Sequence, residues 1–203
     1  MKSRIGALVA VLSTLTVAAG CGDDGGAEPT GQTTQTAPNG DEFNDADVAF
    51  AGEMIQHHAQ ALEMVDMTNG RDLDPEIAEL AEQIRAAQGP EIEQLVDWLT
   101  AWEQPIPETT RDHANSEGDG EMEMDMDMPG MMSEDEMSGL ESEEGPAFEE
   151  RWLEMMIEHH AGAVEMAQSQ QDEGVFGPAV ELAGTIESTQ EAELDRMESL
   201  LDS

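Results

Sequence analysis

Apolar residues recur along two stretches of the chain with the spacing of an α-helix. One row steps by four, three, four and three residues: Phe50, Met54, His57, Ala61 and Met64. The same steps recur in a second row: Trp152, Met156, His159, Ala163 and Met166. Residues three and four apart share one helix face, so each row predicts a helix with a buried side. In the first helix we expect four polar side chains on the outer face: Glu53, Gln56, Gln60 and Glu63.

Start and stop signals divide each stretch into a pair of helices. Asn44 and Asp45 can cap a helix that runs to about residue 68, and Asp74-Pro75-Glu76 can begin a second that ends near residue 102. The later pair should begin after Gly145-Pro146, break near residue 174 and restart at residue 177. Pro90 lacks an N–H and lies inside the second helix, so we expect it to kink that helix.

The two pairs are copies of one unit. At a constant offset of 102 residues (159 − 57), His57-His58-Ala59 matches His159-His160-Ala161, and Glu79-Leu80-Ala81 matches Glu181-Leu182-Ala183. An ungapped match over about fifty residues predicts two helical hairpins of the same design. Two hairpins with such apolar faces most simply close into a four-helix bundle, so the predicted fold class is all-α.

The hairpins divide the chain into five parts. Residues 43–104 are the first hairpin and 148–203 the second, and together they make one domain. Residues 105–147 are an acidic, methionine-rich linker, and residues 21–42 are a Gly/Thr/Gln-rich tether behind a lipoprotein signal peptide, 1–20. The polar composition of the linker and the tether predicts no fixed structure for either.

Each copy carries the motif Met-x-x-His-His-x5-Met. Its residues are Met54, His57, His58 and Met64 in the first copy, and Met156, His159, His160 and Met166 in the second. Met54 lies one turn from His57 on the same face, so both can point at one ion. Met64 is about two turns further along and suits a second site or simple packing. Soft thioether sulfur with imidazole favours Cu(I), with Ag(I) as its mimic, and also accommodates Cu(II).

Polar residues on the later helices can support these histidines. A turn near residue 71 sets Gln88 opposite His57 on the inward row that also holds Glu91, and the repeat sets Gln190 opposite His159 beside Glu193. A buried amide facing a histidine can fix its tautomer and aim the other ring nitrogen at a metal. Without metal, the same residues would satisfy each other as a polar core pair. Both interpretations predict the same contact.

The linker supplies further thioethers. It alternates methionine with carboxylate and continues with more methionines: Met122, Met124, Met126, Met128, Met131 and Met132. Flexible thioether clusters can hold Cu(I) or Ag(I) where thiolates would oxidise. The alternative is a low-complexity segment without function.

The doubled motif resembles a known family. Met-Ile-x-His-His-x-x-Ala-x-x-Met, present from Met54 to Met64 and again from Met156 to Met166, is similar to the exported His-His proteins grouped as a domain of unknown function. The resemblance covers about residues 43–203. It implies a ferritin-like four-helix bundle and, by similarity to periplasmic copper-binding members, copper binding by the Met and His residues above.

The start of the chain predicts a location outside the cytoplasm. A short basic start and an apolar run, residues 5–19, end at Cys21, the sole cysteine, which is typical of a lipoprotein signal with Cys21 as the lipidated residue. Ordinary cleavage beside an idle thiol is the alternative. With 47 acidic and 7 basic residues, the formal charge of −40 repels nucleic acid and attracts cations.

The motifs required by several enzyme classes are missing from the sequence. It contains no Glu-x-x-His of a di-iron site, no His-Glu-x-x-His, and no glycine-rich phosphate loop. We therefore predict a non-catalytic, lipid-anchored copper or silver protein for buffering, tolerance or delivery, with a copper-handling protein as a candidate partner. One alternative is a structural or interaction lipoprotein with a metal-free His-His core. A copper-dependent redox enzyme ranks third.

Overall fold

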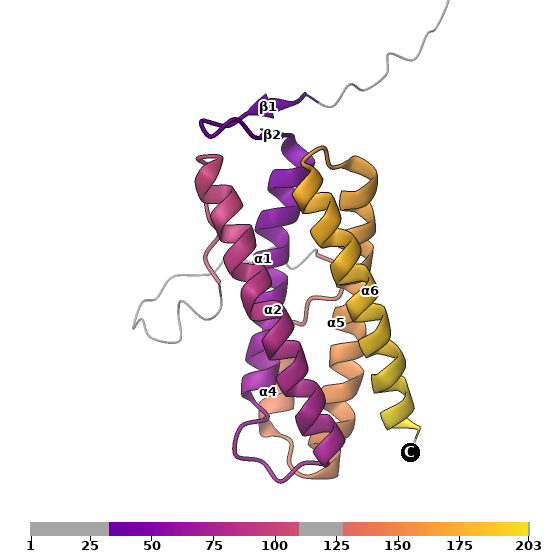
Figure 1. Cartoon of the computed structure of the whole chain (residues 1–203). Coiled ribbons are helices and arrows are strands. Elements are labelled where there is room, and N and C mark those ends of the chain that lie inside the picture. The colour runs from indigo at the N-terminus through magenta and orange to yellow at the C-terminus, as the bar shows by residue number, and fades with distance from the viewer. Residues whose placement is uncertain (1–32, 110–127, 203) are drawn as a thin grey trace, which may run out of the picture. The chain divides into compact units, whose positions relative to one another are not determined.

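The computed structural model describes residues 33–109 and 128–202, which belong to one compact unit. The long helices there are α1 (Asp45–Asp66), α2 (Pro75–Ala101), α5 (Pro146–Glu173) and α6 (Gly177–Leu201). Shorter elements are the two-residue strands β1 (Gln35–Thr36) and β2 (Glu42–Phe43) and the helix α4 (Glu134–Ser142). The described chain is overwhelmingly helical, which confirms the predicted all-α class (Figure 1).

The helices begin where the sequence signals place them. Asn44 caps α1 in a capping box with Asp47, and Asp74 caps α2 immediately before Pro75. Gly145, at φ 59°, precedes Pro146 at the start of α5. The helix α2 continues past Pro90 to Ala101, so this proline does not end it.

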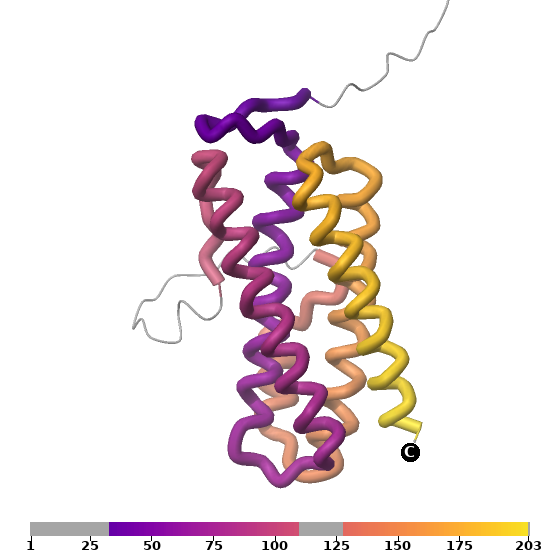
Figure 2. Tube along the Cα trace, in the orientation of Figure 1, coloured from indigo at the N-terminus to yellow at the C-terminus, as the bar shows by residue number. Residues whose placement is uncertain are grey.

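The long helices pack as two hairpins joined through α1 and α5. The helix α1 packs against α2, and α5 packs against α6. At one end of the α1–α5 contact, Gln170 Nε2 donates to Asp47 Oδ1 at 2.6 Å; at the other, Trp152 Nε1 donates to the Met64 carbonyl at 2.9 Å. The start of each helix therefore meets the end of the other, so α1 and α5 run antiparallel, as the trace in Figure 2 shows.

Buried apolar side chains form two clusters along this contact. One contains Phe50, Met54 and Met166, and the other contains Met64, Met156 and the fully buried Trp152. The two His-His pairs fall between these groups along α1 and α5. The core thus places a polar layer between two apolar ones.

Part of the presumed linker is ordered, which corrects the prediction of no fixed structure for residues 105–147. Ser133 and Glu136 form a capping box that starts α4. Met132, Met137 and Leu140 are buried in the same cluster as Trp152. The methionines therefore supply an apolar face, which the acidic composition obscured. The presumed tether is also ordered at its end, because β1 pairs with β2 and Ala37 is buried.

The segment before α4 lies directly on the two central helices. Gln60 donates to the Met132 carbonyl and accepts from the Met132 N–H, both at 2.8 Å. Gln60 is 1 % exposed, so its expected place on the outer face is wrong: this face receives the segment instead of solvent. On α5, Gly162 contacts the backbone of Pro129 and Gly130 so closely that a Cβ there would collide with the Pro129 carbonyl. Within the described ranges, no helix is long and apolar enough to cross a bilayer.

Gly162→Ala should destabilise the protein although alanine is the better helix former. The new Cβ would push residues 129–130 off α5, and overpacking of this kind costs about 1–3 kcal/mol. Gly52→Ala on α1 is the matched control, because a Cβ there meets nothing within 4 Å; it should stabilise by up to about 1 kcal/mol. Urea unfolding measures both, and equal effects of the two substitutions would contradict the close packing.

Candidate metal centre

Four buried histidines occupy the layer between the apolar clusters. His57 and His58 lie on α1, His159 and His160 lie on α5, and all four are fully buried. Consecutive side chains on a helix point about 100° apart, so each pair serves two different interfaces. The rings of His57 and His159 meet between the hairpins, with centroids 3.7 Å apart. The second histidine of each pair faces its own hairpin partner.

Each hairpin contains one histidine–carboxylate pair. His58 Nε2 lies 2.8 Å from Glu91 Oε2 on α2, and His160 Nε2 lies 2.9 Å from Glu193 Oε2 on α6. A carboxylate accepts, so Nε2 of each ring donates in this hydrogen bond and Nδ1 is the nitrogen left over. Glu91 and Glu193 thus contact the second histidine of each pair, and their role in supporting a metal ligand stays a prediction.

The first histidines differ between the repeats. His57 Nε2 lies 3.1 Å from the Pro129 carbonyl, which can only accept, so the proton sits on Nε2. Neither ring nitrogen of His159 has a hydrogen-bond partner within the described residues. Nδ1 is likewise buried and unpartnered in His57, His58 and His160. Buried polar atoms without partners are rare, and a metal ion would satisfy such lone pairs.

The predicted glutamine–histidine hydrogen bonds are not formed. Gln88 and Gln190 are buried, but both amide atoms of Gln88 lack partners, and so does Oε1 of Gln190. The reason is the rotation of α1 about its own axis. His57 faces α5 rather than α2, and His58 is the side chain that reaches α2, where it meets Glu91 one turn beyond Gln88.

The motif methionines flank the histidine layer on both sides. Antiparallel packing places Met54 with Met166 in one cluster and Met64 with Met156 in the other. The methionine three residues before one pair therefore lies on the same side as the methionine that follows the other pair. This pairing across the repeats gives Met64 and Met166 a place near the layer that spacing within one helix did not suggest.

Three of the linker methionines predicted as ligands join these clusters. Met128 and Met131 pack with Met54 and Met166, and Met132 is buried with Met64 and Met156. The remaining predicted residues, Met122, Met124, Met126 and the lipidation residue Cys21, lie outside the described part of the chain.

Sequence reasoning missed the residues that hold this segment in place. Gly162 and Pro129 were not singled out, and Gln60 was expected on the outer face. Gln60 and Gly162 occupy equivalent repeat positions (60 + 102 = 162) yet differ in type. The sequence did contain one signal: beside two matching copies of the motif, the two repeats differ at this position.

The family model described as a domain of unknown function, DUF305, matches residues 47–201. The chain belongs to the DUF305 family. A DUF305 fragment from Deinococcus radiodurans is 30% identical, with coverage of 83% of this chain and 99% of that chain and a TM-score of 0.67. A DUF305 protein from Streptomyces coelicolor, described as secreted, is 32% identical, with coverage of 77% and 92% and a TM-score of 0.66.

A third solved structure carries a metal in its description. CopM in the Cu(II)-bound form is 25% identical, with coverage of 77% of this chain and 95% of that chain and a TM-score of 0.62. Among proteins with a curated function, none matches.

The donor set of this DUF305 chain restricts the kind of site. Among the described residues, no three His, Cys, Asp or Glu side chains are arranged to hold a metal ion. Sites for soft metal ions instead use thioether sulfur beside imidazole. The residues present fit that demand, because buried methionines lie on both sides of the unpartnered Nδ1 atoms.

The environment keeps the central rings neutral. Burial lowers the pKa of His57 to about 3, and the neighbouring His58 acts in the same direction. Burial also holds the pKa of His159 well below its usual value, with His57 and His160 adding to the effect and the His57 backbone opposing it weakly. Neutral rings offer lone pairs to a metal without competition from protons at neutral pH.

Metal-free protein should lose stability as the pH falls from 6.5 towards 3. Between these values an unfolded His57 binds a proton, at its ordinary pKa near 6.5, and the folded ring does not. The stability due to the neutral ring is therefore complete above pH 6.5. From pH 7.5 to 5.0, the contribution of His57 to the free energy of unfolding should fall by about 2 kcal/mol.

His57→Gln provides the comparison, because it removes this titration. The difference in unfolding free energy between wild type and His57→Gln, measured in urea, should narrow by that amount over the same pH interval. Parallel pH profiles would show that His57 is not buried as a neutral ring.

Proposed function

We propose that this protein binds copper or silver ions in its histidine–methionine layer, outside the cytoplasm, and buffers or delivers them without catalysing a reaction. The observation that carries the proposal is the set of four buried Nδ1 atoms without partners, placed between buried methionines of both repeats. A metal-ligating histidine usually donates its other N–H to a carboxylate or a backbone carbonyl. His58, His160 and His57 have such an acceptor already in place.

Ligand chemistry favours a soft ion. Thioethers select Cu(I) and Ag(I), and imidazole also accommodates Cu(II). Met54, His57 and His58, with Met156, His159 and His160, are the proposed ligands. Met64, Met166, Met128, Met131 and Met132 lie in the adjoining clusters as further donors. CopM, described in its Cu(II)-bound form, supports copper as the metal of this fold.

The proposed location is the outer side of the cell membrane, with Cys21 as the lipid-bearing residue. The basic and apolar start of the chain and the single cysteine support this. The Streptomyces coelicolor relative is described as secreted. The partners would be metal ions, the membrane through the lipid, and a copper-handling protein.

We further infer that the four long helices close into one ferritin-like four-helix bundle. In addition to the α1–α5 contact, Arg196 of α6 reaches α2, where it donates to Gln83 at 2.7 Å and pairs with Glu79 at 3.1 Å. This contact would complete the ring of helices.

A metal-free polar core is the competing function. The His58–Glu91 and His160–Glu193 pairs favour it, because each is also a satisfied buried contact. It leaves the unpartnered Nδ1 atoms and the surrounding thioethers without a role.

Met54→Leu with Met156→Leu should weaken Cu(I) binding and leave the fold intact. Leucine conserves volume but has no sulfur, so stability should change by less than about 1.5 kcal/mol per site. The dissociation constant should rise at least as much as after changes to supporting residues, roughly 10–100-fold. Anaerobic competition with a chromophoric Cu(I) chelator measures it.

The matched control is Met155→Leu with Met197→Leu, two buried methionines outside the motif. It should bind Cu(I) like wild type, and so should a chain that lacks residues 110–127. Loss of binding only in the deletion would move the function to the linker. A wild-type protein that never competes with the chelator would leave the histidine pairs as core architecture.

A further inference from the structure

The repeat makes the two ends of the α1–α5 contact equivalent, one at each end of the histidine layer. A shift of 102 residues carries each position of α1 onto α5, and antiparallel packing brings the reverse shift into register around His57 and His159. Any groove on one side of this contact therefore has a counterpart on the other. The two counterparts have different contents.

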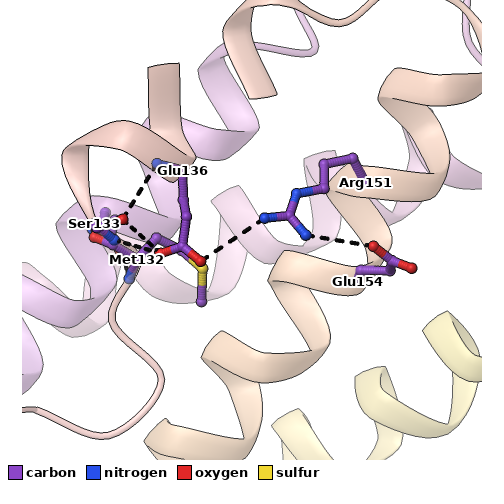
Figure 3. A network of polar contacts seen from close by, with 6 residues as sticks. Met132, Ser133, Glu136, Arg151 and Glu154 are labelled. Atoms are coloured by element: carbon purple, nitrogen blue, oxygen red, sulfur yellow. Dashed lines mark hydrogen bonds and ion pairs between the residues drawn. The ribbon is translucent and has the colours of Figure 1, made fainter. Parts of the chain in front are cut away.

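The helix α4 fills one groove, which we call the α4 groove. It is formed by five residues of α1, α5 and the loop after α1: Met64, Arg71, Phe148, Arg151 and Trp152. Arg71 donates to the carbonyls of Glu141 and Glu143 at the end of α4, at 3.0 and 2.6 Å, and lies over the Phe148 ring. Arg151 lies between Glu136 of α4 and Glu154 of α5, at 3.9 and 3.6 Å (Figure 3). Basic side chains thus hold an acidic helix there.

The counterpart groove is an open pocket of about 240 Å³. Ala46 and Ala49 line it where the repeat has Phe148 and Arg151 (46 + 102 and 49 + 102). Small side chains therefore leave space here, and neither arginine that binds α4 has a basic equivalent: Arg71 corresponds to Glu173 and Arg151 to Ala49. We call this space the α1–α5 pocket.

The chemistry of the α1–α5 pocket suits a cation. Glu53, Glu165 and Glu173 line it, together with Met166. Gln170 also lines it and is 2 % exposed, and its Oε1 has no hydrogen-bond partner among the described residues. Carboxylates, an unpartnered amide oxygen and a thioether therefore face one space.

The pocket adjoins the histidine layer at Pro129 and Met166. Pro129 lines the pocket, and its carbonyl oxygen is the atom that lies 3.1 Å from His57 Nε2. Met166, also in the lining, is buried in one cluster with Met54. On the opposite side, α4 covers the equivalent approach. Within residues 33–109 and 128–202, access to the buried histidines is thus open at one end of the α1–α5 contact and covered at the other.

We propose that the α1–α5 pocket is the route by which Cu(I) or Ag(I) enters and leaves the histidine–methionine layer, an inference that rests on the proposed function. The carboxylates attract the cation, and Met166 receives it beside Pro129. The pocket lining contains one thioether and no imidazole, whereas the layer contains both, so we place the binding site in the layer and the passage in the pocket.

Filling the pocket should slow exchange without changing affinity. Cu(I)-loaded protein is mixed with a chromophoric chelator at concentrations where the release rate no longer depends on the chelator. Ala46→Phe, which installs the repeat's own residue, should slow release at least about tenfold, with the dissociation constant within about twofold of wild type. Ala78→Phe, at an exposed position of α2, is the control and should release at the wild-type rate. Equal rates for both variants would overturn the route.

Charge provides a second test that does not depend on the folding of the filled variant. Glu165→Gln with Glu173→Gln should lower the association rate, calculated from the release rate and the dissociation constant, by about tenfold at low ionic strength. The effect should shrink in high salt. Glu63→Gln, the repeat counterpart of Glu165 on the α4 side, should have no effect. Equal effects of both substitutions would contradict one-sided access.

A metal-free measurement separates failure of the route from failure of copper binding. Diethyl pyrocarbonate acylates unprotonated imidazole, and peptide mapping gives its rate at His57 and His159. Ala46→Phe should slow this modification several-fold relative to Ala78→Phe. If wild type binds no Cu(I) yet shows this difference, the proposed function fails, and the pocket is an access path to the histidine layer for the reagent but not a route for copper. If Cu(I) binds and neither release nor modification changes, only the route fails.

Discussion

The contact between His57 and His159 is the constraint on which the rest of the structure depends. Two fully buried imidazole rings with centroids 3.7 Å apart favour the neutral state of both, because an unpaired charge in an apolar interior is costly. Burial achieves this by lowering the pKa of each ring. Because the rings come from equivalent positions of a repeat, their contact sets the antiparallel register of α1 and α5. That register brings the methionine before one histidine pair beside the methionine after the other.

The connecting segment then breaks the symmetry that the repeat creates. Gln60 binds the backbone of Met132, and its counterpart Gly162 admits Pro129 and Gly130 against α5. The two equivalent positions therefore hold different residues: an amide that binds the segment's backbone on α1, and a glycine that leaves room for the segment on α5. As a result, among the residues that the structure describes, only His57 receives a carbonyl on Nε2, and the ordered segment fills one of the two equivalent grooves. A duplicated hairpin has thereby become an asymmetric site with a closed side and an open side.

Local signals predicted the helices, and long-range geometry decided the contacts of the site. Asn44, Asp74 and Gly145 act within one turn of the chain, so the helix ends could be deduced from neighbouring residues. Whether His57 faces Gln88 or His159 depends on how α1 is rotated between two other helices, which spacing along one helix does not determine. The ordering of residues 128–142 was missed for a related reason. Acidic composition indicated solvent exposure, whereas Met132, Met137 and Leu140 are buried against the central helices.

Charge balance in the histidine layer distinguishes among the ions that its ligands could accept. Neutral imidazoles and thioethers bring no negative charge, so an ion entering the layer keeps its own. The carboxylates bonded to the rings are Glu91 and Glu193, whose side chains are 15% and 12% exposed. Burying a charge is costly unless it is paired, and the cost rises steeply with the charge of the ion. One monovalent ion in each repeat would be balanced by one glutamate, whereas a divalent ion would leave an excess positive charge in an apolar core. Under the proposed function, charge balance therefore favours the same monovalent ions, Cu(I) or Ag(I), that thioether ligands prefer.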